Sequence, residues 1–336
     1  MAVKRLGQRT IKYSNPPVII ATGTIVGPVE GRGPLAPDFD AVLPDLYMGQ
    51  STAEKAESKM LEEACNIALQ TAQLKPEDVH YMLAGDLLNQ IISASFTARQ
   101  LSIPYLGLYG ACSTISEALT IAAMIVDGGF ADTVLAAASS HYQTAERQYR
   151  YPIELNIKRK TTSQYTVTGA AAAVIKAQGT GPRVTCSTVG RVLDLGVKDP
   201  NDMGSAMAPA AADTLFWHFS DTNTRMEDYD LVLTGDLGRV GRVMLGEVLK
   251  DKGIALASNY NDCGLMIYAP NENVGAGGSG CACSGVVTLG HIYKSMTRGL
   301  LKKVLLVATG ALMSPLSYQQ GETIPTIAHA IVIERP

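Results

Sequence analysis

The chain contains an internal duplication, and this feature limits its possible folds more than any other. Residues 77–86 read Glu-Asp-Val-His-Tyr-Met-Leu-Ala-Gly-Asp, and residues 227–236, 150 positions later, read Glu-Asp-Tyr-Asp-Leu-Val-Leu-Thr-Gly-Asp. Residues 110–113 (Gly-Ala-Cys-Ser) also match residues 281–284 (Cys-Ala-Cys-Ser), and each precedes an apolar helical stretch. Solenoid units repeat every 20–50 residues or so. A period near 150 therefore indicates two duplicated half-domains.

The two halves are predicted to share one order of elements: helix, strand, helix, strand, strand. Residues 53–73 have apolar side chains at helical spacing with charged residues between them, which predicts an amphipathic helix. Residues 118–126 have no polar face, which is typical of a helix covered on all sides. We therefore expect an α/β protein with a five-layer αβαβα arrangement, in which two sheets enclose this helix and carry outer helices. The expected halves are residues 1–197 and 198–336.

Composition excludes several classes of protein. Apolar residues make up 46% and charged residues 18% of the 336 residues, so a packed globular chain is expected and a disordered one is not. A net charge of -3 argues against nucleic acid as a partner, because affinity for nucleic acid comes largely from neutralising phosphates. No signal peptide is recognisable, and no apolar run approaches the roughly 20 residues that cross a bilayer. Any membrane association is expected to be peripheral.

The six cysteines are scattered, so we expect them to be reduced. Cys281 and Cys283 form a lone Cys-x-Cys without a second pair or a suitably spaced histidine, and no metal site is therefore predicted. Cys112 differs because it precedes the buried helix. The free N–H groups and the positive end of the helix dipole favour a thiolate there, which would be a strong nucleophile. The alternative is a small buried residue at a tight turn.

The duplicated halves, the strand at residues 76–83 and the Gly-Ala-Cys-Ser turn at Cys112 resemble the thiolase and ketoacyl-synthase superfamily of condensing enzymes. This resemblance implies a nucleophilic cysteine at Cys112. It also implies a histidine after the second-half strand and an asparagine in a later turn, or two histidines. Residues 235–238 contain no histidine, residues 277–280 contain no asparagine, and no proline follows Gly290-His291. We therefore predict a degenerate, non-catalytic site, although His141 stays open as a base.

Residues 16–24, 110–114 and 277–285 are similar, more closely, to a family of sporulation proteins of spore-forming bacteria. That resemblance implies binding of dipicolinic acid (pyridine-2,6-dicarboxylic acid), which is taken into the developing spore and released at germination. It also implies that the protein acts together with membrane proteins of the same sporulation system at the spore inner membrane. Two alternatives stay open. One is an acyl-transferring condensing enzyme that uses Cys112, and the other is a structural subunit that binds no small molecule.

A pocket is expected where the helices that begin at Cys112 and Cys283 point towards one cavity. Two helix N-termini favour carboxylates. The expected ligand-binding residues on these two segments are Cys112, Ser113, Thr114, Cys283 and Ser284.

Three aspartates complete the predicted site. Asp86 and Asp236 follow matching strands and are expected at the rim of the cavity, although both can instead stabilise turns. Asp194 is a weaker candidate that rests on topology alone. Carboxylates repel an anionic ligand unless a cation or a proton intervenes, so calcium is predicted as a possible companion of dipicolinate, bound as its chelate.

Two segments have open roles. Residues 141–166 contain five basic residues and four tyrosines, and three interpretations compete: a solvated loop, a surface for a homodimer or another partner, or a basic gate for an anionic ligand. The superfamily resemblance favours a homodimer. Residues 27–44 are rich in glycine and proline and predict a surface loop, which could also dock a partner.

Overall fold

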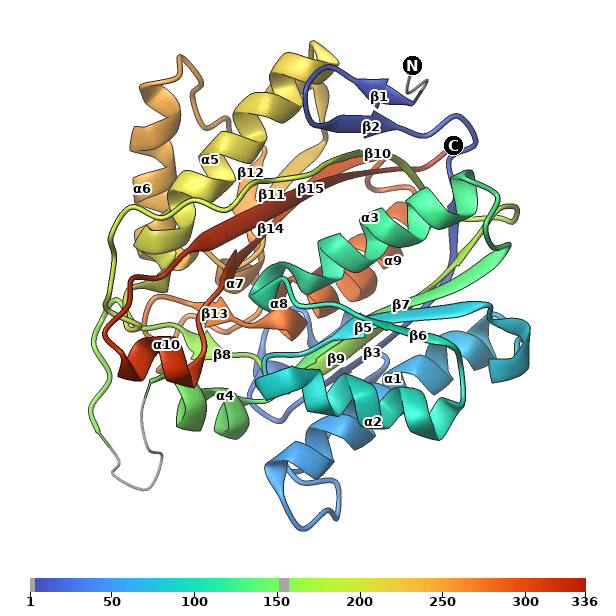
Figure 1. Cartoon of the computed structure of the whole chain (residues 1–336), viewed down its shortest axis with the longest axis horizontal. Coiled ribbons are helices and arrows are strands. Elements are labelled where there is room, and N and C mark those ends of the chain that lie inside the picture. The colour runs from blue at the N-terminus through green and yellow to red at the C-terminus, as the bar shows by residue number, and fades with distance from the viewer. Residues whose placement is uncertain (1–3, 151–156) are drawn as a thin grey trace.

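The structure is a computed structural model that describes residues 4–150 and 157–336 (Figure 1). Its strands form two groups of five in matching order. The first group is β3 (Val18–Val26), β9 (Gly169–Lys176), β7 (Thr133–Ser140), β5 (Tyr81–Gly85) and β6 (Tyr105–Gly107). The second group is β10 (Arg183–Thr188), β15 (Thr326–Glu334), β14 (Lys303–Ala311), β11 (Leu231–Thr234) and β12 (Tyr260–Asp262).

Each strand of the first group has its counterpart in the second. In the first group β9 is antiparallel to both of its neighbours, β3 and β7, while β5 runs parallel to β6 and β7. In the second group β15 is antiparallel to β10 and β14, while β11 runs parallel to β12 and β14. The two groups join through a single antiparallel contact between β3 and β10, at Val18 and Arg183. The predicted duplication into two related sheets is therefore confirmed. The predicted division at residues 197 and 198 stays a prediction.

Helices and sheets alternate in five layers (Figure 1). On the outer face of the first sheet lie α1 (Ala53–Thr71) and α2 (Ile92–Leu101). Between the sheets lie α3 (Thr114–Asp127), α8 (Cys281–Val286), the π-helical turn η8 (Val287–Ile292) and α9 (Tyr293–Thr297). On the outer face of the second sheet lie α5 (Met203–Thr222) and α6 (Gly238–Lys250). The predicted five-layer αβαβα fold is confirmed.

The residue pattern explains these layers. The central helix α3 packs against strands of both sheets, and its Ile115, Leu119 and Ala122 are fully buried. This is why the sequence of the helix has no polar face. The central strands of both sheets are also covered by helices on both faces. Their sequences are therefore continuous apolar runs, as in β9 and β14. The helix predicted over residues 53–73 is α1, which ends two residues earlier.

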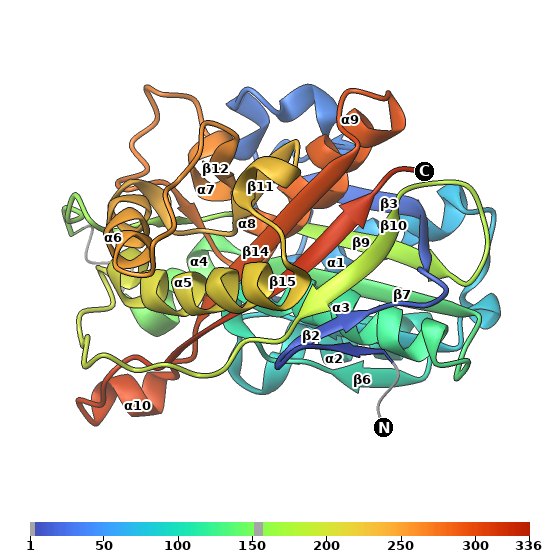
Figure 2. The same cartoon turned by 90° about the horizontal axis from the view of Figure 1, so that it is seen from above.

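The remaining elements are short; one of them, α10 (Pro315–Gln319), lies at the edge of the molecule in Figure 2. The strands are β1 (Arg5–Leu6), β2 (Thr10–Lys12), β4 (Ala41–Val42), β8 (Tyr165–Thr166) and β13 (Gly278–Ser279). The helices are α4 (Tyr142–Tyr149), α7 (Cys263–Met266) and α10 (Pro315–Gln319). The 3₁₀ turns are η1 (Glu30–Arg32), η2 (Ala36–Asp38), η3 (Pro76–Asp78), η4 (Asn89–Ile91), η5 (Ala111–Ser113) and η7 (Met226–Asp228). The pairing of β8 with β13 brings the two halves together beside Cys112.

The glycine- and proline-rich segment 27–44 is an ordered loop that packs on the second half. It contains η1, η2 and β4. Asp38 accepts from His291 Nδ1 at 2.6 Å and pairs with Arg298 at 3.1 Å, and Lys294 pairs with Asp40 at 2.7 Å. The imidazole of His291 is therefore used to fasten this loop.

Candidate functional site

Cys112 lies at the sharp turn between β6 and α3, within η5. Ala111, immediately before it, has a φ of 48°, a left-handed conformation that is uncommon for a residue with a Cβ. Holding such a residue costs roughly 1–3 kcal/mol, and such strain gathers at functional sites. The turn leaves Cys112 only 5% exposed, facing a small cavity.

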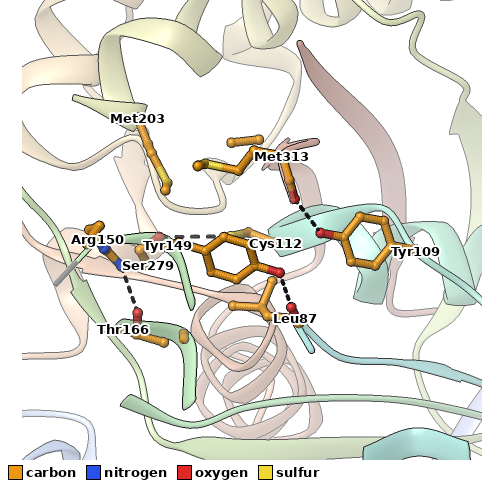
Figure 3. A pocket seen from close by; sticks show the side chains of 11 residues that line it. Leu87, Tyr109, Cys112, Tyr149, Arg150, Thr166, Met203, Ser279 and Met313 are labelled. Atoms are coloured by element: carbon orange, nitrogen blue, oxygen red, sulfur yellow. Dashed lines mark hydrogen bonds between the residues drawn. The ribbon is translucent and has the colours of Figure 1, made fainter. Parts of the chain in front are cut away.

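The cavity has a volume of about 20 Å³, which is room for roughly one water-sized group (Figure 3). Side chains from both halves of the chain surround it. They are Leu87, Tyr109, Cys112, Ala145, Tyr149, Arg150, Thr166, Met203, Ser279, Ala311 and Met313.

The thiol of Cys112 is held beside a carboxyl group. Its Sγ lies 3.9 Å from Ser279 Oγ, and it also interacts with the side chain of Asp236. Burial raises the pKa of the Cys112 thiol well above its ordinary value, and the negative charge of Asp236 raises this pKa further. This shift favours the thiol over the thiolate and agrees with the alternative of a small buried residue at a tight turn.

Asp236 stands where the superfamily resemblance implies a histidine. Its carboxyl group accepts hydrogen bonds from Thr309 Oγ1 at 2.7 Å, from Ser279 Oγ at 2.8 Å and from the Gly280 N–H at 3.2 Å. Burial nevertheless raises the pKa of Asp236 above its usual range. Thiol, hydroxyl and carboxyl group thus form a connected buried set in which the carboxyl group is the acceptor.

No histidine lines the cavity in the part of the chain that the structure describes. His141, whose role as a base was left open, caps α4: its Nδ1 accepts from the Gln143 N–H at 3.2 Å, and its Nε2 contacts the Leu46 carbonyl at 2.8 Å. Burial lowers the pKa of His141. Both ring nitrogens are thus occupied by the backbone, which is the role of a structural cap.

Asp86 is buried but does not line the Cys112 cavity; its neighbour Leu87 does. Asp86 accepts from the backbone N–H groups of Leu88 and Ala94, each at 2.8 Å, and so fixes the turn from β5 into α2. Burial raises the pKa of Asp86 to about 6. The structure thus brings Asp236 to Cys112 and gives Asp86 a turn-stabilising position.

The other predicted residues bond locally. Ser113 donates to the Gly110 carbonyl at 2.7 Å, Thr114 to the Ala111 carbonyl at 2.7 Å, Ser284 to the Cys112 carbonyl at 3.4 Å and Cys283 to the Gly235 carbonyl at 3.5 Å. These four residues are buried beside the turn without lining the cavity. Asp194 is exposed, where it accepts from the Gly196 N–H at 2.9 Å and from the Thr323 hydroxyl.

Several residues that line the cavity were not predicted. Tyr149 and Arg150 lie at the end of α4, within the basic segment 141–166. The interpretation of this segment as a basic gate for an anionic ligand could have identified them. In the described part of this segment α4 is partly buried, which contradicts a wholly solvated loop; residues 151–156 lie outside the described residues. No sequence pattern indicated that Met203 and Met313 line the cavity, because their position beside Cys112 depends on how α5 and β14 pack.

Within residues 4–150 and 157–336, no group of three or more histidine, cysteine or acidic side chains is arranged to hold a metal ion. None of the helices described there is long and apolar enough to traverse a bilayer.

Comparison with known families and proteins shows that this chain is closely related to one family of sporulation proteins. A family model described as stage V sporulation protein AD (SpoVAD) matches residues 7–334. The chain is 50% identical over 333 residues to stage V sporulation protein AD of Bacillus subtilis strain 168, with 99% of this chain and 98% of the relative covered.

Solved structures of condensing enzymes share the fold at low sequence identity. An acetyl-CoA acetyltransferase from Syntrophomonas wolfei has a TM-score of 0.59 at 14% identity, with 96% of this chain and 100% of that chain covered. A 3-oxoacyl-[acyl-carrier-protein] synthase III from Aquifex aeolicus has a TM-score of 0.56 at 15% identity, with 95% and 99% covered. These likenesses describe the fold and leave the chemistry to the residues of this chain.

Proposed function

The chain belongs to the stage V sporulation protein AD family, and on that premise we propose that it binds dipicolinic acid at the Cys112 cavity without chemically changing it. The binding serves uptake into the developing spore and release at germination. The observation that carries the proposal is the surroundings of Cys112. Its buried thiol lies 3.9 Å from Ser279 Oγ, which donates to Asp236, and no histidine is among the described residues that line the cavity.

The chemistry of condensation argues for binding over turnover. A condensing enzyme needs a thiolate for acyl transfer and an oriented acid or base for proton transfer, which typically contributes 10²–10⁴-fold. Burial and the neighbouring Asp236 raise the pKa of the Cys112 thiol, which disfavours the thiolate. A carboxylate in the histidine position also repels the enolate and thioester oxyanions that an imidazole or asparagine would stabilise. Both differences favour retention of a ligand over its conversion.

The lining of the cavity is suited to a flat aromatic acid. Tyr109 and Tyr149 offer aromatic faces, and Arg150 is the charged side chain among the described lining residues. Because the cavity holds about 20 Å³, a pyridine ring enters only when lining side chains move. Met203 and Met313 are unbranched and change rotamer at low cost, so they provide the adaptable wall that such entry requires.

Equilibrium binding of dipicolinate to the purified protein tests this proposal. We expect a saturable complex without a covalent adduct, weakened by Cys112→Ala, with Asp194→Ala as a surface control. Mass spectrometry after incubation with acetyl- and malonyl-CoA tests the condensing-enzyme alternative. An acyl group on Cys112 that Cys112→Ser removes would overturn the non-catalytic proposal.

The structural-subunit alternative predicts an unchanged melting temperature. At 100 times its dissociation constant, a ligand that binds only the folded state stabilises it by about 2.7 kcal/mol. A melting temperature that does not rise at saturating dipicolinate would therefore favour a structural role.

Calcium remains part of the proposal as a companion of the ligand. The carboxyl group of Asp236 repels a dianion, and a calcium chelate of dipicolinate reduces that repulsion. Calorimetry with calcium dipicolinate, and with dipicolinate in chelator, measures the effect. Equal affinities in the two experiments would show that calcium is not required for dipicolinate binding.

We further propose a homodimer, located at the spore and peripheral to its inner membrane together with other stage V sporulation membrane proteins. β6 is the terminal strand of its sheet, and on and beside it Leu106 is 48% and Tyr109 40% exposed. An exposed apolar edge strand is a template for pairing with another chain. Light scattering of the purified protein measures the oligomeric state.

A further inference from the structure

Arg150 holds a fixed position at the Cys112 cavity. It follows α4 directly, and only 3% of its side-chain surface is exposed. Its Nη1 donates to the Gln164 carbonyl at 2.6 Å and its Nη2 to Thr166 Oγ1 at 2.7 Å, while Nη2 also lies 3.0 Å from Glu146 Oε1 (Figure 3 shows the contact with Thr166). Three contacts therefore fix the plane of the guanidinium group.

These contacts leave part of the guanidinium group unused. Arginine has five N–H donors. Among the residues that the structure describes, Nε of Arg150 has no hydrogen-bond partner although it is buried. Buried charged donors are costly to leave unpaired, so such an atom needs an explanation. The cavity that Arg150 lines is large enough for one carboxylate oxygen.

The side chains around Arg150 carry an excess of positive charge, which favours binding of an anion. Glu146 is shared, because its Oε2 lies 3.5 Å from Arg159 while its Oε1 contacts Arg150. Arg159 otherwise lies over the stacked rings of Tyr142 and Tyr165, at 5.0 and 4.9 Å from their centroids. Two guanidinium groups and a single carboxylate give this cluster a net positive charge at neutral pH, and a ligand carboxylate would balance it.

We propose that Arg150 is the carboxylate anchor of the Cys112 cavity and determines which ligands it accepts. This inference rests on the proposed function and assigns its specificity to a single side chain. The free Nε–H donates to one carboxylate of an aromatic acid. The side of the cavity near Cys112 and Ser279 is unfavourable for that carboxylate, because Asp236 lies behind these residues.

Binding measurements with four proteins and three ligands test the anchor. The proteins are the wild type, Arg150→Gln, Glu146→Gln and, as a surface control, Arg242→Gln on α6. The ligands are dipicolinate, picolinate with one carboxylate, and pyridine with none. We expect Arg150→Gln to weaken dipicolinate binding roughly 10- to 100-fold, the range of a charge-assisted hydrogen bond, and Arg242→Gln to leave it unchanged. Picolinate should bind and pyridine should not.

Glu146→Gln distinguishes an anchor from a structural ion pair. It removes the competing carboxylate but keeps Arg150, so dipicolinate should bind as tightly as to the wild type or more tightly. An equal loss of affinity in Glu146→Gln and Arg150→Gln would overturn the anchor, because disruption of the buried pair would explain both. If Arg150→Gln does not fold, Arg150→Lys replaces it: an ammonium group keeps the charge but loses the planar contact, and unchanged affinity in that variant contradicts the proposal.

Failure of the anchor and failure of the proposed function give different results. If the wild type and Arg150→Gln bind dipicolinate equally, the anchor is wrong and the proposed function stands. If the wild type does not bind dipicolinate, the proposed function is wrong. The anchor is then judged by melting temperature with benzoate, picolinate and isophthalate: stabilisation that Arg150→Gln abolishes supports it, and its absence with all three overturns it.

Discussion

Replacing Glu57 by glutamine should change how the stability of this protein depends on pH. Glu57 belongs to α1 and is fully buried, where it accepts from Ser139 Oγ at 3.1 Å and from Thr144 Oγ1 at 2.9 Å. Burial, followed by the charge of Asp86, raises the pKa of Glu57 from 4.5 to about 8. The folded state therefore binds a proton that the unfolded chain has released at neutral pH.

The sign and size of the effect follow from this shift. A carboxyl group with a raised pKa in the folded state destabilises the protein as pH rises from its unfolded to its folded pKa. Between pH 5 and pH 7.5 the wild type should lose roughly 3 kcal/mol of stability through Glu57, since one pKa unit corresponds to about 1.4 kcal/mol. With an unfolding entropy of about 2.1 cal/mol/K per residue, this corresponds to about 4 °C in melting temperature.

The assay is the melting temperature of the wild type, Glu57→Gln and Glu63→Gln at several pH values between 5 and 7.5. Glu63 lies on the same helix, is paired with Lys59 and is partly exposed, so Glu63→Gln should keep the pH trend of the wild type. The gap between Glu57→Gln and the wild type should move in favour of the variant as pH rises, whatever the cost of the altered hydrogen bonds. A gap that stays constant across this range would refute the reasoning.

Three further predictions follow from the site and its surface. Asp236→Asn should lower the pKa of the Cys112 thiol and speed its alkylation by iodoacetamide at pH 8, as followed by mass spectrometry; an unchanged rate would show that Asp236 does not govern the thiol. Thr309→Val removes a 2.7 Å hydrogen bond to buried Asp236 and should cost about 1–3 kcal/mol in chemical unfolding, and a neutral result would contradict the described contact. Leu106→Asp on the edge strand β6 should shift light-scattering mass to that of a monomer without lowering the melting temperature of the subunit, whereas an unchanged dimer would place the interface elsewhere.

The elements of the fold were predictable where a residue pattern is compatible with only one kind of secondary structure and burial. The duplicated stretches at 77–86 and 227–236 contain β5 and β11 and most of the 3₁₀ turns, η3 and η7, that precede them. The apolar stretch 118–126 lies in α3 between the sheets, as its pattern predicts, but it is not covered on every side, because Met124 is 45% exposed. These features depend on local periodicity and on comparison of the chain with itself.

The site was predictable only in part. The position of Cys112 at a turn into a buried helix came from local sequence, but the charge of its sulfur depends on Asp236, which lies 124 positions away and approaches because the halves face each other. Asp86 and Asp236 occupy equivalent positions in the repeat and yet have different neighbours, since the interface between the halves surrounds only one of them with Cys112 and Ser279.

The sequence by itself determined the two related halves, the layers and the candidate nucleophile, because these follow from spacing and apolar pattern along the chain. The tertiary structure alone decided the protonation of Cys112, the small size of the cavity and the entry of Arg150 into it. The physical reason is that pKa values, packing and ion pairing depend on groups brought together from distant parts of the chain, and no local pattern records their distances.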